Sequence, residues 1–511
     1  MNNYILEHFY RWLIRLDASY WSAPFFYPFP YTIAFSESLL GSAPIYALFR
    51  FAGLDGVSSF QGWFLVGYSL NFFSAAGVLS KAKFHPLAVG VGGFLFAFGL
   101  PVLAQENHAQ LLYRCFVPLA CYSLWELYQL ADLKKTLLFC LAMVGQFFLS
   151  VYIGVFLFTL TVVMALLMIV MDSRSRSIRS IYSNFADNLL GDWARSSVRR
   201  RFLFASWALT LLIAFGALMY PYFHVSRVYG FVRTWEEISA LLPRPESFLL
   251  ADNSGLWGNF SLSLSDIPNR HEHQLFPGLA AAVLLITGIS FLRPFPKMPA
   301  LYLWAVMISL VLTINIQGYS FYKLFFGVPG LNSIRGITRL ELVLIWPVAF
   351  FITWVLDVLL KFPGRYKNVI CFGAYSLILL MALESVLYNH TVYDRFDAEA
   401  RLEELQQDIP MPNSKSPILF SARSPDEPAW MTEMDAMLVS QRLGWATFNG
   451  YSGNAPPNYE PAKACRKLPR RIQTYIDFSG IEEDRYYFDL MNRTVLVGFE
   501  DCDPRWWTNP P

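Results

Sequence analysis

The sequence is poor in charged residues: Asp, Glu, Lys and Arg together make up 15% of its 511 residues. An average soluble domain carries roughly 25%, so this composition excludes an ordinary soluble enzyme and a disordered chain. The formal charge of +2 supplies no basic field, which argues against nucleic acid as a partner. Six cysteines are too few to form a disulfide scaffold over this length.

Apolar side chains are abundant instead, at 55% of the residues, and they include 45 Phe. A helix that crosses a bilayer needs about 20 mostly apolar residues, because its backbone groups cannot stay unpaired in hydrocarbon. The run 136–171 is too long for one such helix, so we divide it near Ser150–Gly154. The sequence thus predicts an α-helical polytopic membrane protein with about ten transmembrane helices. The other predicted spans are 61–80, 86–104, 111–131, 202–220, 277–292, 299–316, 339–360 and 368–387.

Basic residues gather in every second loop between these spans. They are Lys81 and Lys83; Lys134 and Lys135; Arg174, Arg176, Arg179, Arg195, Arg199, Arg200 and Arg201; Arg293 and Lys297; and Lys361, Arg365 and Lys367. Because Lys and Arg are enriched in cytoplasmic loops, we expect these loops to face the cytoplasm. Residues 1–60, the loops 221–276 and 317–338, and the tail 391–511 are then extracytoplasmic, around a bundle formed by residues 61–390.

This orientation places the N-terminal segment outside the cytoplasm, although the segment lacks the basic region and apolar core of a signal peptide. We therefore expect a further hydrophobic helix upstream of Met1. A mature protein that begins at Met1 would contradict this expectation.

The segment 1–60 carries apolar and aromatic residues in short stretches. The spacing of Tyr4, Leu6 and Phe9 predicts a helix that lies on the membrane surface. The aromatic residues between 20 and 27 suit the lipid headgroup zone. A second short interfacial helix is predicted within Leu39–Phe51.

The tail 391–511 differs from the rest of the chain by its acidic clusters and prolines. The predicted strands are Ile418–Phe420 and Val495–Phe499, and the predicted helices are Met431–Leu443 and 461–476. We expect a small C-terminal α/β domain. Its two cysteines, Cys465 and Cys502, either form a disulfide or remain free thiols, and the sequence leaves both open.

Ionisable groups near a membrane are costly, so they are candidates for function. Glu106, His108, Gln110 and Arg114 follow the second predicted span. They form either a polar wall of an outward-facing cavity or a solvated loop that caps two helices. Helical spacing places Gln110 and Arg114 on one face.

Arg335 and Arg339 stand four residues apart at the start of the ninth predicted span. Arginine keeps its charge and binds phosphate with two parallel hydrogen bonds, so this pair predicts a phosphate or pyrophosphate clamp. The alternative is that both residues anchor an ordinary span to lipid headgroups.

The largest central outside loop contains His271, Glu272 and His273. Two histidines at this spacing are able to bind zinc, but no third ligand stands at a recognised spacing, so we predict no metal site. Glu272 as a base or hydrogen-bonding group in a cavity is the preferred interpretation.

Several short motifs, in their order and spacing, resemble a group of bacterial polytopic proteins related to the GT-C class of membrane glycosyltransferases. They are Ile5–Trp12, Phe26-Tyr27-Pro28 with Pro30, Ser36–Gly41, His108–Leu112, Phe276-Pro277-Gly278, Pro329-Gly330 with Ile334, Arg335 and Arg339, and Asn449–Gly453. The resemblance runs over most of the chain. It implies a GT-C-like protein of the bacterial cytoplasmic (inner) membrane that moves a sugar from a polyprenyl-phosphate carrier to a cell-envelope glycan or lipid. It also implies a first helix followed by an acidic catalytic residue, and both are absent from this sequence.

Such a transfer needs a carboxylate that takes the proton of the acceptor hydroxyl and fixed cations that stabilise the departing phosphate, without any cofactor. The candidate bases are Glu37, Glu7 and, after them, Glu106. The candidate phosphate ligands are Arg335, Arg339 and Arg114, and the candidates for lining the sugar site are His108, Gln110 and Glu272. For Glu37 an equal alternative is that it complements a helix dipole.

Two other functions stay open. A transporter or flippase of a lipid-linked glycan would show internal repeats and broken helices, and neither is clear in the sequence. A catalytically inactive scaffold for envelope assembly would be consistent with the absent first helix. The sequence does not identify the sugar, the acceptor or the oligomeric state.

Overall fold

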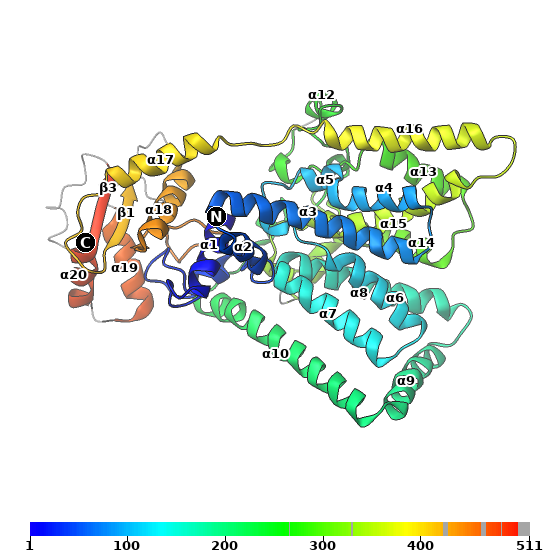
Figure 1. Cartoon of the computed structure of the whole chain (residues 1–511), viewed down its shortest axis with the longest axis horizontal. Coiled ribbons are helices and arrows are strands. Elements are labelled where there is room, and N and C mark those ends of the chain that lie inside the picture. Colours follow the sequence, from blue (N-terminus) through cyan, green and yellow to red (C-terminus); the bar gives the residue numbers. More distant parts are fainter. Residues whose placement is uncertain (265, 329–330, 423–427, 461–466, 482, 499–511) are drawn as a thin grey trace. The chain divides into compact units, whose positions relative to one another are not determined.

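The computed structural model describes residues 1–511 except 265, 329–330, 423–427, 461–466, 482 and 499–511. The chain divides into two compact units. One unit consists of Met1–Gly62, Leu218–Phe231 and Val392–Pro511, and we call it the terminal unit because it contains both chain ends. The other consists of Trp63–Ala217 and Val232–Thr391, and we call it the bundle (Figure 1).

Among the described residues, six helical segments are long and apolar enough to cross a membrane. They are α3 (Gly56–Lys81), α4 with α5 (Pro86–Phe98 and Leu100–Leu103), α8 (Val151–Ser173), α10 (Val198–Tyr229), α15 with the turn before it (Glu341–Leu360 after Ile337–Leu340), and α16 (Lys367–Val386). The predicted helical membrane character is therefore supported. The predicted number of ten spans is not established by these six.

The remaining predicted spans also contain helices, but shorter ones. These are α6 (Phe116–Gln129), α7 (Leu133–Leu149), α13 (Leu279–Phe291) and α14 (Lys297–Thr313). The long run 136–171 divides at Ser150, where α7 ends and α8 begins, and the Ser150 hydroxyl accepts a hydrogen bond from the Ile153 N–H at 3.3 Å. A serine at this position satisfies one of the free N–H groups of the new helix. Short helices α11 (Trp235–Ser239) and α12 (Gly258–Leu262) lie in the loop before α13.

Helix α15 forms the core of the bundle. Every residue from Glu341 to Leu356 is buried, and the helix packs against α4, α13 and α14. A helix that is apolar on all sides needs such complete cover by its neighbours. Gly92 of α4 leaves room for Thr353, because a side chain at Gly92 would overlap with its hydroxyl.

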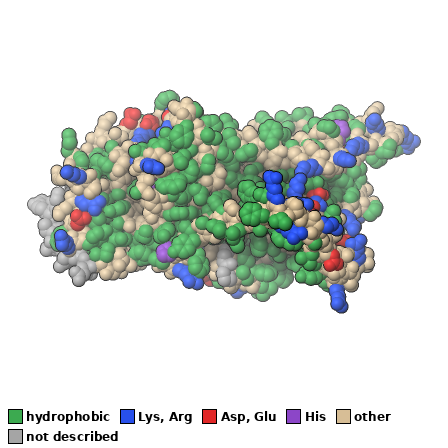
Figure 2. Space-filling view, turned by 60° about the horizontal axis from the view of Figure 1, so that its bottom comes forward, with side chains coloured by type: hydrophobic (Ala, Val, Ile, Leu, Met, Phe, Trp, Pro, Cys, Tyr) green, Lys and Arg blue, Asp and Glu red, His purple; other side chains and the backbone are tan. Residues whose placement is uncertain are grey.

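The loops that carry the basic residues lie at one end of the bundle, on the right in Figure 1. Lys297, the first residue of α14, forms an ion pair with Asp172 near the end of α8, at 3.2 Å. The N–H of His85, before α4, donates to Asp357 near the end of α15 at 2.6 Å. Figure 2 shows Lys and Arg side chains gathered in the right-hand part of the view, while hydrophobic side chains cover most of the middle. We call the end of the bundle at which these basic loops lie the basic end.

The terminal unit contains a three-stranded parallel sheet with strand order β2-β1-β3. The strands are β1 (Ile418–Ala422), β2 (Ala446–Thr447) and β3 (Thr494–Gly498), and Ile418 is paired with both Ala446 and Thr494. The helices are α1 (Asn2–Leu13), α2 (Ala43–Phe51), α17 (Arg395–Gln407), α18 (Ala429–Leu443), α19 (Lys467–Ser479) and α20 (Glu483–Arg493). The small sheet with helices agrees with the α/β organisation expected for the tail. The possible Cys465–Cys502 pair lies outside the described residues.

The N-terminal segment packs into the same unit as the tail. Gln441 of α18 donates to the carbonyl of Tyr4, and the Phe26 N–H donates to the carbonyl of Asn449, both at 3.0 Å. Phe25 and Phe26 are fully buried, and Gly450 leaves the space that the Phe26 ring occupies. The prediction that the aromatic residues between 20 and 27 occupy the headgroup zone is therefore wrong for these two phenylalanines, because the fold of the tail provides them with a core.

Helix α1 differs from the prediction in a similar way. Its residues Tyr4, Leu6 and Phe9 are buried inside the terminal unit, although they suggested a helix lying on the membrane. Trp12 and Leu13 at its end remain exposed. An amphipathic pattern predicts that one face is covered, but it does not distinguish lipid from protein as the cover.

Candidate functional site

Three of the predicted site residues meet in the bundle. His108 follows α5, Glu272 ends a 3-10 turn (Arg270–Glu272), and Arg339 lies in the 3-10 turn (Ile337–Leu340) before α15. Arg339 donates from Nε to Glu272 Oε2 at 3.0 Å and from Nη2 to Glu272 Oε1 at 2.5 Å. His108 Nε2 lies 3.0 Å from Arg339 Nη2 and 3.4 Å from Glu272 Oε1. We call these three residues the charged cluster.

The charged cluster lies far from the basic end. Helix α15 begins directly after the turn that holds Arg339 and ends at Leu360, beside the basic loops. Its 20 residues correspond to about 30 Å of helix. The cluster and the basic loops therefore occupy opposite ends of the bundle core.

Burial in the cluster is graded. The side chains of Glu272 and Arg339 are 4% and 10% exposed, whereas that of His108 is 30% exposed. Burial by itself raises the pKa of Glu272, but hydrogen bonds from the protonated form of His108 and from Arg339 outweigh it, so that pKa lies well below its usual value. Glu272 is therefore ionised at neutral pH and is a weak base.

The proton on His108 decides its partner. An arginine N–H cannot accept a hydrogen bond, so the contact with Arg339 requires a neutral imidazole with a free lone pair on Nε2. A protonated imidazole would instead donate to Glu272. His108 is thus the member of the cluster whose hydrogen-bond partner depends on its protonation state.

Tyr152 of α8 supports the cluster from the side. Its hydroxyl accepts a hydrogen bond from the Gly336 N–H at 2.6 Å, and the Arg339 guanidinium lies 5.4 Å from the centre of its ring. The contact fixes the backbone just ahead of Arg339. No sequence motif pointed to Tyr152, because a tyrosine at the start of an apolar span is common at membrane interfaces.

Arg335 lies four residues before Arg339 and is exposed. Its side chain makes no hydrogen bond or ion pair with any residue that the structure describes. The predicted clamp thus consists of one arginine held by Glu272 and one that projects into solvent. Only Arg335 is free to meet a phosphate without a rearrangement.

A small pocket adjoins the cluster, lined by Glu106, His108 and Arg114 together with apolar residues such as Tyr68 and Leu342. Its volume of about 10 Å³ holds about one water molecule. Glu106 Oε1 accepts a hydrogen bond from the Thr391 N–H at 2.7 Å, and its Oε2 lies 2.7 Å from His390 Nδ1. Sequence reasoning missed His390 and Thr391, which are 284 and 285 residues away from Glu106 in the chain.

Arg114 does not reach the cluster as a phosphate ligand. Its side chain is fully buried and donates to the carbonyls of Phe96 at 3.1 Å and Leu342 at 3.0 Å. Phe96 lies in the last turn of α4 and Leu342 in the first turn of α15, so Arg114 links the two helices from a buried position, which fits neither the wall of an outward-facing cavity nor a solvated loop. Gln110 is half-buried in the 3-10 turn Ala109–Leu111.

The neighbours of Glu272 have separate roles. His273 is buried, with Nδ1 2.8 Å from the Ser247 hydroxyl and Nε2 3.1 Å from the Ala240 carbonyl, whereas His271 is exposed. Within the part of the chain that the structure describes, no three His, Cys, Asp or Glu side chains gather as a metal site requires. Both nitrogens of His273 are taken, so it holds the loop in place.

The other two candidate bases belong to the terminal unit. Glu7 accepts a hydrogen bond from the Tyr46 hydroxyl at 2.6 Å and forms an ion pair with Arg50 at 2.9 Å, which ties α1 to α2. Glu37 is buried near the start of α2. Neither residue is part of the charged cluster, which lies in the bundle.

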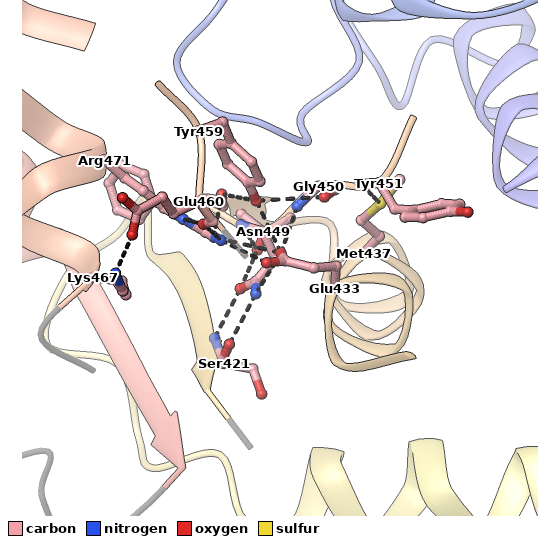
Figure 3. A network of polar contacts seen from close by, with 12 residues as sticks. Ser421, Glu433, Met437, Asn449, Gly450, Tyr451, Tyr459, Glu460, Lys467 and Arg471 are labelled. Atoms are coloured by element: carbon pink, nitrogen blue, oxygen red, sulfur yellow. Dashed lines mark hydrogen bonds and ion pairs between the residues drawn. The ribbon is translucent and has the colours of Figure 1, made fainter. Parts of the chain in front are cut away.

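A second polar network lies within the terminal unit (Figure 3). Arg471 of α19 donates from Nη2 to Glu433 Oε1 of α18 at 2.5 Å. Glu433 Oε2 also accepts from Asn449 Nδ2, the Gly450 N–H and the Tyr459 hydroxyl at 2.9–3.0 Å. The carbonyls of Phe448 and Glu460 accept the remaining arginine protons. Asn449 and Gly450 thus hold the buried Glu433 carboxylate, which gives this motif a structural role.

No protein family model, curated protein or solved structure matches the chain. A function is therefore inferred from the chemistry of the charged cluster and from the apolar helices around it. The cluster combines a fixed cation with a half-exposed imidazole, and an exposed arginine, Arg335, lies four residues before Arg339 in the chain. Such a set is suited to binding an anion and moving a proton beside it.

Proposed function

We propose that the protein is a membrane-embedded glycosyltransferase that moves a sugar from a polyprenyl-phosphate carrier to a cell-envelope glycan or lipid. The observation that carries the proposal is the charged cluster, a partly exposed Arg–Glu–His arrangement at the end of the bundle opposite the basic loops. The resemblance to GT-C proteins supports it. The proposal includes ten spans, a bacterial cytoplasmic membrane and an extracytoplasmic terminal unit.

Each cluster residue has a role in this reaction. Arg339 is held by Glu272 and, with Arg335, stabilises the departing phosphate. Glu272 is too weak a base to take the acceptor proton, because the pKa of its carboxyl is depressed by its partners. Its contribution is to position Arg339, and His108 lines the sugar site.

Glu106 is the proposed base in the bundle. It lines the same pocket as His108, and its two hydrogen-bonded oxygens retain free lone pairs. Glu106 takes the proton of the acceptor hydroxyl as that oxygen forms a bond to the anomeric carbon. The bond from this carbon to the phosphate oxygen breaks, and its electron pair goes to the phosphate. The reaction needs no cofactor.

The test is a transfer assay with purified protein in lipid nanodiscs and a labelled polyprenyl-phosphate sugar. We expect Glu106→Gln and the double change Arg335→Gln with Arg339→Gln to lower transfer at least about a hundredfold. His271→Gln is the matched control, because His271 is exposed next to Glu272 but outside the cluster. Undiminished transfer by the arginine double variant would remove both residues from the site.

A deletion strain supplies a test in the cell. Loss of the transferase predicts that one sugar disappears from an envelope glycan while its lipid-linked donor accumulates. An unchanged glycan profile would contradict the proposal.

The second candidate is a scaffold or a transporter of a lipid-linked glycan. The size of the pocket favours the scaffold, because the pocket holds about one water molecule and so leaves no preformed space there for a sugar. The two candidates separate in the nanodisc assay: a transporter or scaffold would bind the lipid-linked donor without consuming it.

A further inference from the structure

We propose that helix α9 (Ile178–Arg195) lies along the membrane surface at the basic end and binds anionic lipid headgroups. The helix connects α8 to α10, two of the helices that are long and apolar enough to cross a membrane. It has no buried residue, although it is 18 residues long. The proposal concerns a face of this helix that protein leaves uncovered.

The sequence of α9 is amphipathic. At helical spacing, Ile178, Tyr182, Leu190 and Trp193 fall on one side, and Asn184 and Asp187 fall on the opposite side. The four apolar residues are 38–74% exposed. A row of exposed side chains that includes a tyrosine and a tryptophan is unfavourable in water and suits the boundary between headgroups and acyl chains.

The charge around α9 identifies the kind of surface. Residues 173–201 contain seven arginines and two acidic residues, Asp187 and Asp192. Asp192 is already engaged, because it pairs with Arg200 and accepts the Leu133 N–H, both at 3.0 Å. Arg174, Arg176 and Arg179 are exposed, and within the described part of the chain their side chains make no hydrogen bond or ion pair.

Contacts with the bundle fix the end of the bundle at which α9 lies. Asp192 holds the start of α7, and Arg201 of α10 donates to the Ala194 carbonyl at 2.7 Å while its guanidinium lies 5.9 Å from the Trp193 ring. The helix is therefore held where α8 ends and α10 begins. Each basic residue near an anionic leaflet adds roughly a fivefold gain in membrane affinity, and the apolar row adds a contribution that does not depend on lipid charge.

The test is hydrogen–deuterium exchange of the full-length protein in two kinds of nanodisc, one with zwitterionic lipid alone and one with added anionic lipid. We expect peptides that cover α9 to exchange on the order of tenfold more slowly with anionic lipid. Exchange in α15 serves as the internal reference, because that helix is buried in protein in either lipid.

Three variants separate the two contributions. The triple change Arg174→Gln, Arg176→Gln and Arg179→Gln should abolish the difference between the two lipids and keep the protection seen with zwitterionic lipid. Tyr182→Ser with Leu190→Ser should lose protection in both. Asp187→Asn is the control of opposite sign and should retain or increase the response to anionic lipid.

Exchange in α9 that is the same in both lipids and in all variants would overturn the proposal. So would protection that depends on protein concentration, because this would show that a second copy of the chain covers the face. Unchanged exchange in α15 ensures that a variant has kept its fold.

Discussion

The two compact units each contain a buried arginine–glutamate pair, and the two pairs differ in their surroundings. In both, a guanidinium meets a carboxylate through two hydrogen bonds, the shorter at 2.5 Å. Around Glu433 and Arg471, which are 3% and 5% exposed, backbone and side-chain groups occupy the remaining positions (Figure 3). Around Glu272 and Arg339, the next neighbour is a half-exposed histidine, and the exposed Arg335 lies four residues before Arg339 in the chain.

This difference separates a structural pair from a candidate functional one. A buried pair whose hydrogen bonds are all made by the protein has no capacity left for a ligand. A pair with a half-exposed neighbour, as His108 is for Glu272 and Arg339, is accessible to a ligand from that side. The chemistry of the residues is the same in both places, and the two pairs differ in how much of their surroundings is exposed.

The largest effect is expected when the Glu433–Arg471 pair, which we call the closed pair, is broken. Arg471→Met leaves the Glu433 carboxylate buried without its cation, which costs about 3–5 kcal/mol. Thermal unfolding and protease sensitivity of the terminal unit measure this loss. Arg470→Met is the matched control, because Arg470 is the preceding residue and is mostly exposed. Equal losses for both variants would show that the closed network does not stabilise the unit.

A smaller loss of stability is expected when the Glu272–Arg339 pair, which we call the open pair, is broken, and this loss should depend on pH. Because the pKa of Glu272 in the folded protein is depressed below its unfolded value of about 4.3, its contribution to stability is complete at neutral pH. It is lost as the pH falls below that value through the folded pKa. Glu272→Gln should cost about 2–3 kcal/mol at pH 7.

The measurement is the stability difference between wild type and Glu272→Gln from pH 7 down to pH 3. The difference should shrink at acidic pH, because the Glu272 carboxyl of the unfolded wild type becomes protonated below its ordinary pKa while the folded state keeps it ionised, which favours unfolding. A difference that is constant over this range would contradict an ionised Glu272 in the folded state.

A third buried carboxylate, Glu384, extends the comparison to a site without an arginine. It accepts hydrogen bonds from Trp257 Nε1 at 2.8 Å and from the Leu279 N–H at 2.6 Å, at the start of α13. Gly278 has φ +95°, and a Cβ there would lie 2.5 Å from Glu384 Oε2. Gly278→Ala should therefore destabilise the bundle by about 1–3 kcal/mol.

Gly373→Ala serves as the matched control for this change. Gly373 lies in α16, the helix that also carries Glu384, and no atom lies within 4 Å of the position that a Cβ would take there. Alanine at this position should leave thermal unfolding unchanged or raise its midpoint slightly. A similar loss at both positions would show that Glu384 does not need the glycine.

The smallest effect on stability is expected at Arg335. Since this side chain is exposed, Arg335→Gln should change the free energy of unfolding by less than about 0.5 kcal/mol. Under the proposed function it should still weaken binding of a polyprenyl phosphate, which titration in nanodiscs measures. Unchanged binding would limit the role of the open pair to Arg339.

Local properties of the chain were predictable from the sequence. Apolar composition predicted helices across the bundle, and the excess length of 136–171 predicted the break that lies at Ser150. The apolar run at Ile418 became strand β1, and the pattern over 431–443 became part of α18. These features depend on neighbours within about one helical turn or one strand, so a single sequence contains the information.

The partners of charged residues were decided by tertiary structure alone. Glu272 and Arg339 are 67 residues apart, and His108 is 231 residues from Arg339. The resemblance placed Arg114 with the phosphate ligands, and aromatic character placed Phe26 in the headgroup zone. Packing instead directed Arg114 to helix carbonyls and Phe26 into a protein core. Hydropathy predicts that a polar group in this chain must be buried with a partner or exposed. The identity of the partner depends on packing between segments far apart in the sequence, so only the folded chain determines it.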